Sequence, residues 1–236
     1  MSKDMNLRKV ITILAVAGAL VAMTASISLA QESKSIQLSK PDLGSGISLM
    51  QALSKRSSSR EFSPDPLPAG VLSNLLWAGF GINRPNGMRT APSGMNWQDI
   101  DVYVILSDGL YLYDAKASQL KLISSEDLRG LAGTQDYVKT APINLIYVSD
   151  FAKMENKEVM GAYGKMTGRS PDEAKLLFAG AHTGTIAQNV YLYCASEGLA
   201  TVVRAFIDTT ALAKAMQLRP DQKITLGQSV GYPKKK

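Results

Sequence analysis

The chain reads RSSSREF at residues 56–62, so that two arginines bracket three consecutive serines. An arginine guanidinium offers a planar fork of donors that matches phosphate oxygens, and serine hydroxyls and backbone N–H groups can fill the remaining acceptor sites. The run follows a short segment with helical character, residues 47–53. This pattern indicates a phosphate-binding loop, with a solvated polar loop as the simpler alternative for so short a motif.

A second polar stretch follows in an irregular segment that begins at residue 83. It is rich in glycine, proline, asparagine and serine, and long irregular loops of this kind are usually functional. Its end reads PSGMNWQ at residues 92–98, where Asn96 and Gln98 carry amides that can donate and accept at the edge of a heteroaromatic ring. The two segments together favour a bound cofactor.

The rest of the chain offers little for other kinds of chemistry. Its 236 residues are 45% apolar and 19% charged, and the net charge of +6 comes from scattered bases rather than a basic stripe that would favour nucleic acid. His182 and Cys194 are the only residues of their types, which leaves no intrachain disulfide and no usual zinc shell. We interpret His182 as a packing or hydrogen-bonding residue and Cys194 as a buried thiol. We therefore expect no metal, no nucleic acid and no catalytic side chain, so that a cofactor would carry any reaction.

The N-terminus has the features of an export leader. Lys3, Arg8 and Lys9 precede an apolar run over residues 10–22, and small residues lead to a cleavage site after Ala30. We expect a signal peptide at 1–30 and a periplasmic or secreted protein with no stable membrane partner. The alternative is an uncleaved leader that anchors the chain in the membrane, because this stretch is nearly long enough to span a bilayer.

The mature part is predicted to hold a linker at 31–42 and one α+β domain at 43–236. An Asp-Gly step at 108–109 between two apolar runs predicts a hairpin, and an entirely apolar run at 143–148 is typical of a strand buried on both faces. Further strands are expected at 119–123, 200–207 and 224–230, and further helices at 67–80, 125–131 and 210–217.

The longest helix is predicted with both of its ends. Ser170, a proline and Glu173 form an N-terminal capping box, and Gly198 suits a left-handed C-terminal residue. The helix would therefore run over 171–197. Because it carries several glycines and alanines between residues 179 and 187, which permit close backbone approach, we expect it to be central and buried.

The ordered set of motifs resembles the nitroreductase family of FMN-dependent oxidoreductases. Residues 56–62 match the family's Arg-x-Ser-x-Arg-x-Phe and residues 92–98 match Pro-Ser-small-x-Asn-x-Gln. Gln188-Asn189, the strand entry at 198–201 and the closing Gly-Tyr-Pro-Lys at 231–234 follow in the right order. The resemblance covers nearly the whole mature chain, about residues 43–236. It implies a mostly antiparallel central sheet flanked by helices, in an intertwined homodimer with FMN in the subunit interface.

The resemblance also implies roles for individual residues. Arg56, Ser58 and Arg60 would hold the phosphate and ribityl chain, in a loop where Ser57 replaces a residue that is basic in many members. Lys234 or Lys236 would add a phosphate contact. Asn96 would bond the isoalloxazine, with Ser93 and Gly94 against the ring from the partner subunit. The backbone N–H groups of Val203, Arg204 and Ala205 would face the flavin N5 and O4. Pro92 and Gln98 complete the set of residues expected to bind the cofactor.

The implied reaction is hydride transfer through flavin N5 to or from a small organic substrate, such as a quinone-like or nitroaromatic acceptor. NAD(P)H is one candidate donor, although an exported enzyme would need another. Residues 75–82, 89–93 and 109–114 are similar to the branch that contains azoline-peptide dehydrogenases, which gives one alternative function. A non-catalytic flavin-binding protein is another. The sequence leaves two roles open for Trp77 and Trp97: they could line the substrate slot, or they could pack in the core.

Overall fold

A computed structural model describes residues 35–235, which form one compact unit. The predicted signal peptide, its cleavage site and residues 31–34 of the predicted linker lie outside these residues, as does Lys236. The remaining linker residues, 35–42, are described and begin with a short strand, Ser35–Gln37. Within the described part of the chain, no helix is long and apolar enough to cross a membrane.

The centre of the unit is a seven-stranded sheet in the order β1-β4-β3-β2-β5-β7-β6. Every neighbouring pair is antiparallel, which confirms the predicted sheet type. The predicted hairpin joins β2 and β3, and β5 is buried along its whole length as expected. The strands are β1 Ser35–Gln37, β2 Ile100–Leu106, β3 Gly109–Asp114, β4 Gln119–Ser124, β5 Ile143–Asp150, β6 Ala200–Arg204 and β7 Gln222–Gly231.

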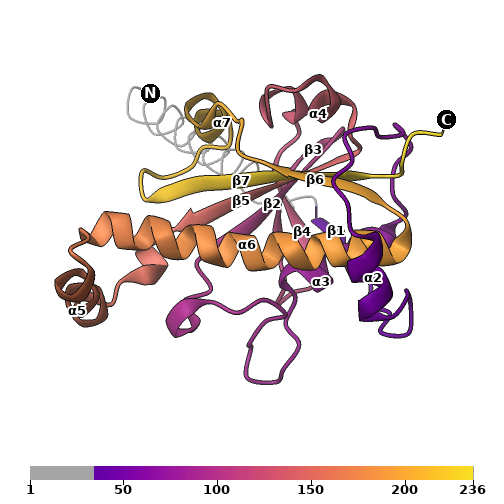
Figure 1. Cartoon of the computed structure of the whole chain (residues 1–236). Helices are drawn as coiled ribbons and strands as arrows, with labels where there is room; N and C mark the ends of the chain where they lie inside the picture. Colours follow the sequence, from indigo (N-terminus) through magenta and orange to yellow (C-terminus); the bar gives the residue numbers. More distant parts are fainter. Residues whose placement is uncertain (1–34, 236) are drawn as a thin grey trace, which may run out of the picture. The chain divides into compact units, whose positions relative to one another are not determined.

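Helices cover both faces of the sheet (Figure 1). The α-helices are α2 Leu49–Lys55, α3 Ala69–Phe80, α4 Asp136–Thr140, α5 Lys157–Thr167, α6 Pro171–Glu197 and α7 Thr209–Ala215, and the 3-10 turns are η1 Gly94–Asn96, η2 Arg129–Leu131 and η3 Phe151–Met154. Figure 1 shows α2, α3 and α6 on one side of the sheet and α4 and α7 on the other.

Strand alternation builds a separate core on each face. On one face, Val104 and Tyr147 pack with Leu75 of α3 and Ile186 of α6. On the other face, residues one position along the same strands pack with Val138 of α4 and with α7. Successive strand side chains point to opposite faces, so strands that are apolar throughout are buried on both. The sheet thus gives a rigid platform whose edges and ends remain open.

The helix α6 has the predicted ends. Ser170 accepts from the backbone N–H of Glu173, whose carboxylate accepts in return from the Ser170 backbone and hydroxyl, and Gly198 ends the helix at a φ of 70°. The prediction that the helix is buried was right for one face only. Ala179 and Ala187 face the core, whereas Gly180 and Gly184 are exposed on the opposite side.

Two other segment predictions were wrong. The helix expected at 125–131 is only the short turn η2, because the Asp127 carboxylate accepts from the Arg129 backbone N–H and competes with helical hydrogen bonds. The strand expected at 200–207 ends at Arg204, since Ile207 N–H turns back to the Ala205 carbonyl and Asp208 then caps α7.

Candidate functional site

The Arg/Ser run lies extended beside the edge strand β6. The backbone N–H of Ser59 donates to the Thr201 carbonyl at 2.9 Å. The Ser58 hydroxyl shares a hydrogen bond of 2.8 Å with the hydroxyl of Tyr191 on α6, and the Arg56 guanidinium lies 5.3 Å from the centre of the Tyr191 ring. Edge strand and helix together fix this segment, while Ser57 and Arg60 remain exposed. The structure thus brings cationic and hydroxyl donors together in an accessible loop.

The C-terminal segment joins the same place. Phe62 forms a bridge with Pro233, and Ser63 N–H donates to the Tyr232 carbonyl at 2.9 Å. Lys234 N–H donates to the Glu61 carbonyl at 3.3 Å, next to Arg60 in sequence. The sequence separates these segments by most of the chain, yet the fold places the backbone of Lys234 beside Glu61, directly after the Arg/Ser run.

The backbone at the end of β6 has one amide bonded within the protein and one exposed residue beyond the strand. Val203 N–H donates to the Tyr191 hydroxyl at 2.9 Å, so this amide is already paired inside the chain. Ala205, beyond the end of the strand, is exposed. Of the three residues predicted to face a flavin through their backbone, Ala205 is therefore the one whose surroundings suit that contact best.

Arg204 turns its side chain into the core beneath this segment. Its guanidinium donates to the Ser229 hydroxyl, the Ala132 carbonyl and the Asn144 side-chain oxygen at 2.8–2.9 Å. All three acceptors are neutral, and burial lowers the pKa of Arg204 to about 10. Sequence reasoning missed this role because a charged side chain at a strand end is ordinarily exposed.

The segment 92–98 adopts an unusual backbone around η1. Met95, Asn96 and Gln98 have φ values of 51°, 53° and 47°, a left-handed region that residues other than glycine seldom occupy. Pro92, Met95 and Asn96 are exposed. Such strain persists only where surrounding contacts impose it, and it is common at ligand sites.

Hydrogen bonds from Gln98 hold this backbone in place. Its side-chain oxygen accepts from Arg89 Nε at 2.7 Å, and its side-chain nitrogen donates at 3.1 Å both to the Gly87 carbonyl and to the Asn96 side-chain oxygen. The Gln98 backbone N–H donates to the Ser93 hydroxyl at 3.0 Å. Since its oxygen accepts from Gln98, Asn96 has its amide orientation fixed, and its NH₂ group remains available to a ligand. Gln98 itself is engaged within the loop.

A buried polar chain supports the other end of the segment. The Gly94 N–H donates to His182 Nε2 at 2.7 Å, and His182 Nδ1 lies 2.6 Å from an oxygen of the fully buried Asp99. The second oxygen of Asp99 accepts from the Ser149 hydroxyl at 2.8 Å. The sequence indicated a hydrogen-bonding role for His182, but Asp99 and Ser149 lie in no motif that could have marked them.

Both tryptophans have packing partners. The Trp97 ring meets the Phe178 ring at 5.3 Å in an edge-to-face contact, within the small cluster formed by η3, α5 and α6. The Trp77 indole N–H donates to the Ile82 carbonyl at 3.1 Å. These contacts account for both side chains without a ligand.

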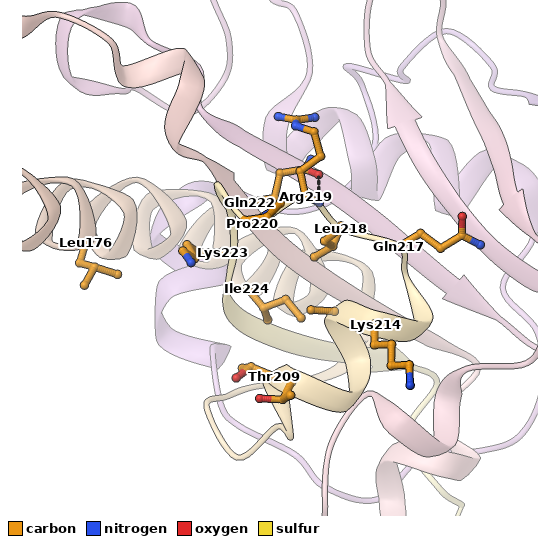
Figure 2. A pocket seen from close by; sticks show the side chains of 12 residues that line it. Leu176, Thr209, Lys214, Gln217, Leu218, Arg219, Pro220, Gln222, Lys223 and Ile224 are labelled. Carbon is orange, nitrogen blue, oxygen red and sulfur yellow. Dashed lines mark hydrogen bonds between the residues drawn. The ribbon is translucent and has the colours of Figure 1, made fainter.

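A cavity of about 650 Å³ lies away from the predicted residues, between α7, the start of β7 and the N-terminal half of α6 (Figure 2). Figure 2 shows Leu176 coming from α6, with Lys214 and Arg219 extending in opposite directions around an apolar base that includes Ile224. The Arg219 guanidinium is already paired with the Asp150 carboxylate at 2.8 Å. None of the predicted site residues lines this cavity.

Comparison with known proteins shows which family the chain belongs to. The model of the Nitroreductase family matches residues 53–232, from α2 through the sheet to Tyr232. The chain belongs to the nitroreductase family. The match spans the predicted cofactor residues at 56–60, 92–98 and 203–205, and it ends before Lys234 and Lys236.

Individual members of the nitroreductase family agree with this placement. A candidate nitroreductase of Methanocaldococcus jannaschii is 30% identical over 184 residues, which cover 73% of this chain and 86% of that protein. The crystal structure of a candidate nitroreductase from Ralstonia eutropha is 40% identical, with a TM-score of 0.74 and coverage of 87% of this chain and 92% of that one.

A second nitroreductase structure contains FMN, the cofactor that the resemblance implies. It comes from Desulfovibrio desulfuricans, was solved in complex with FMN, and is 21% identical with a TM-score of 0.54, covering 79% of this chain and 87% of that chain. At this identity the likeness concerns the fold. The FMN is that protein's ligand.

Proposed function

We propose that this nitroreductase-family chain is an FMN-dependent oxidoreductase. The observation that carries the proposal is the convergence of residues 56–60, the edge strand β6 and the segment around Lys234, with Tyr191 bonded to both Ser58 and Val203. These parts are distant in sequence and supply guanidinium, hydroxyl and backbone donors in one place. Bound FMN would supply hydride transfer at its N5 atom.

The donor set fits a phosphate. Arg56 and Arg60 offer charge-assisted bonds to phosphate oxygens, and the hydroxyls of Ser57 and Ser58 offer shorter-range donors. The contacts of Tyr191 with Arg56 and Ser58 hold two of these groups before any ligand arrives, which reduces the entropy lost on binding. Lys234 would add a further positive charge, and Lys236 remains a proposed contact outside the described residues.

The chain's other proposed contacts address the heteroaromatic end of the cofactor. Asn96 would donate from its free NH₂ group, whose direction Gln98 sets. Ala205 would donate its backbone N–H where charge develops on the ring. Pro92, Ser93 and Gly94 would form the wall of the slot and exclude water. No side chain of this chain is assigned a proton transfer.

We propose a homodimer as the working form. One face of α6 exposes Leu177, Gly180, Ala181, Gly184 and Gln188, at helical spacing, and a methyl group added to either glycine would meet no atom within 4 Å. The neighbouring α2 exposes Leu49 and Met50. A second copy could pack closely along this face, and its segment 92–98 would then complete the slot of the first.

The substrate is proposed at the level of a small quinone-like or nitroaromatic acceptor, with NAD(P)H or another hydride source as donor. The azoline-peptide dehydrogenase function stays an alternative. Leu75, Leu76 and Phe80 are core residues of α3 and residues 109–114 form the inner strand β3, so these two stretches report packing. The third stretch of that likeness, residues 89–93, reaches the proposed slot. Export through the predicted leader is a separate proposal, which processing of the precursor would test.

The experiment is flavin retention by the protein comprising residues 31–236. After incubation with FMN and gel filtration, we expect the visible flavin spectrum to co-elute with protein. Arg56→Gln/Arg60→Gln should weaken binding by at least about tenfold, since each charge-assisted bond contributes about 1.5–3 kcal/mol. Arg169→Gln, an exposed arginine between α5 and α6, is the matched control and should bind normally.

Absence of co-eluting flavin from the wild-type protein would refute FMN dependence. Turnover is tested next, by anaerobic reduction with a panel of donors followed by reoxidation with quinones and nitroaromatics. Bound FMN that no donor and no dithionite-coupled mediator reduces would instead identify a flavin-binding protein without activity.

A further inference from the structure

We propose that His182 is a positioning residue for the flavin slot: its neutral imidazole accepts the Gly94 N–H and, braced by Asp99 and Ser149, holds segment 92–96 in its binding conformation. The inference rests on the proposed function only in naming what the segment binds. The series of hydrogen bonds from Gly94 through His182 and Asp99 to Ser149 is present in the protein without cofactor.

The contacts of His182 fix its protonation pattern. A backbone N–H can only donate, so His182 Nε2, which lies 2.7 Å from the Gly94 nitrogen, must be the unprotonated acceptor. The proton of the neutral ring therefore sits on Nδ1 and is donated to the Asp99 carboxylate 2.6 Å away. The single contact to Gly94 thus determines one tautomer for the ring.

The contacts of Asp99, on the side of His182 away from Gly94, prevent the imidazole from turning. Asp99 is fully buried and is also held by the Ser149 hydroxyl of β5 at 2.8 Å. Its backbone carbonyl accepts from the Asp150 N–H at 2.8 Å, which ties it to the sheet. Phe178 stacks beside His182 with ring centres 6.0 Å apart. The acceptor presented to Gly94 is therefore connected rigidly to the central strands.

The segment needs such support. Met95 and Asn96 have positive φ, which costs conformational energy for residues with a Cβ. Gln98 secures the far end of the segment through Arg89, and His182 secures the near end at Gly94. Gly94 also permits the approach, because a Cβ there would lie 3.3 Å from His182 Nε2. Loss of the near contact would free the residues that form the wall of the slot.

A pair of substitutions separates the two contacts of His182. In His182→Gln, the side-chain oxygen can take the place of Nε2 and accept from Gly94, but the bond to Asp99 is lost. In His182→Asn, the shorter amide can take the place of Nδ1 and donate to Asp99, but the Gly94 acceptor is lost. If holding Gly94 is the role of His182, glutamine should preserve function and asparagine should not.

The variants are compared by FMN affinity and by a readout that needs no cofactor. In a Trp77→Phe background, Trp97 is the remaining tryptophan, and acrylamide quenching of its emission in flavin-free protein reports the opening of the segment. We expect His182→Asn to weaken FMN binding by at least about tenfold and to increase quenching. His182→Gln should bind FMN more tightly and show less quenching than His182→Asn, because it keeps the Gly94 acceptor and gives up only the Asp99 contact.

Equal behaviour of the two variants, or better binding by asparagine than by glutamine, overturns the proposal. If His182→Asn fails to fold, the wild-type protein still gives a decision. His182 is the only histidine, so a long-range proton–nitrogen NMR spectrum reports its tautomer without ambiguity. We expect a proton on Nδ1 and none on Nε2, and the opposite tautomer would refute the assignment. If the wild type binds no FMN, the proposed function fails, whereas the tautomer and quenching results still judge this inference.

Discussion

Gln98 uses both atoms of its side-chain amide inside its own loop. It had been assigned to the edge of the cofactor because asparagine and glutamine in an irregular segment are equally suited to a ring. In the structure its oxygen accepts from Arg89 and its nitrogen orients Asn96. The two amides therefore have different roles: Gln98 fixes the orientation of the Asn96 amide, and Asn96 is exposed where the ligand is proposed to bind.

At the residue scale we predict that Gln98→Leu weakens FMN binding by about tenfold and lowers the free energy of unfolding by about 1–2 kcal/mol, because Arg89 and Asn96 lose a partner. Gln119→Leu, on β4, is the control and should change neither quantity. Titration with FMN and urea unfolding measure the two effects. Unchanged FMN affinity in Gln98→Leu would show that the loop is held without this side chain.

Sequence reasoning could select these polar residues but not their directions. The positive φ values at Met95, Asn96 and Gln98 redirect successive side chains, and no glycine marks those positions in the sequence. Arg204 was equally hidden, since only the tertiary structure supplies the three neutral oxygens that its guanidinium meets. Local motifs therefore predict membership of a site, whereas long-range contacts decide the role of each member.

The α6 helix shows what local chemistry can specify at the element scale. Its capping box and its terminal glycine lie within a few residues of the ends they define, so both ends could be read from the sequence. The face that it buries depends instead on the sheet and on any partner. For that reason the sequence predicted both ends of α6 correctly, but it did not predict that one face of the helix is exposed.

We predict that Ser170→Ala lowers the free energy of unfolding by about 1 kcal/mol at pH 7, as removal of an N-cap hydroxyl usually does. Its control is Ser125→Ala, in an exposed loop, which should have no effect. Hydrogen bonds from Ser170 hold the pKa of the Glu173 carboxyl below its ordinary value. A depressed acidic pKa stabilises the fold above the ordinary value and loses that effect as the pH falls.

The cost of Ser170→Ala should therefore shrink in acid, where the Glu173 carboxyl takes up its proton. Denaturant unfolding of both proteins at pH 7 and at pH 3.5 measures the difference. A cost that is the same at both pH values would mean that the carboxylate contributes nothing to the cap.

At the scale of the whole molecule, the sheet has helices on both faces, but the exposed side of α6 has no neighbour within the described chain. Small residues on that side offer close approach rather than a broad apolar surface. This arrangement suits a second long helix crossing at short distance, which is how two copies of α6 would meet in the proposed homodimer.

We predict that Gly184→Leu converts the homodimer into a folded monomer. The added side chain enters open space in the single subunit and improves helix propensity, so the subunit itself should fold normally, but it would collide with a crossing helix. Gly161→Leu on α5 is the matched control, since a Cβ there also meets no atom within 4 Å. Light scattering after gel filtration measures the mass, and a dimeric Gly184→Leu would exclude this face as the interface.

The pairing of residues 61–63 with residues 232–234 has a consequence for the order in which the protein matures. Arg56 and the serines are synthesised well before Lys234 and before Thr201, whose carbonyl accepts from the Ser59 N–H. The site formed by the Arg/Ser run, Thr201 and Lys234 does not exist until β6 and β7 have joined the sheet. A cofactor held there would be captured only after residues 200–234 have been synthesised and folded, so its supply need not coincide with the synthesis of residues 56–60.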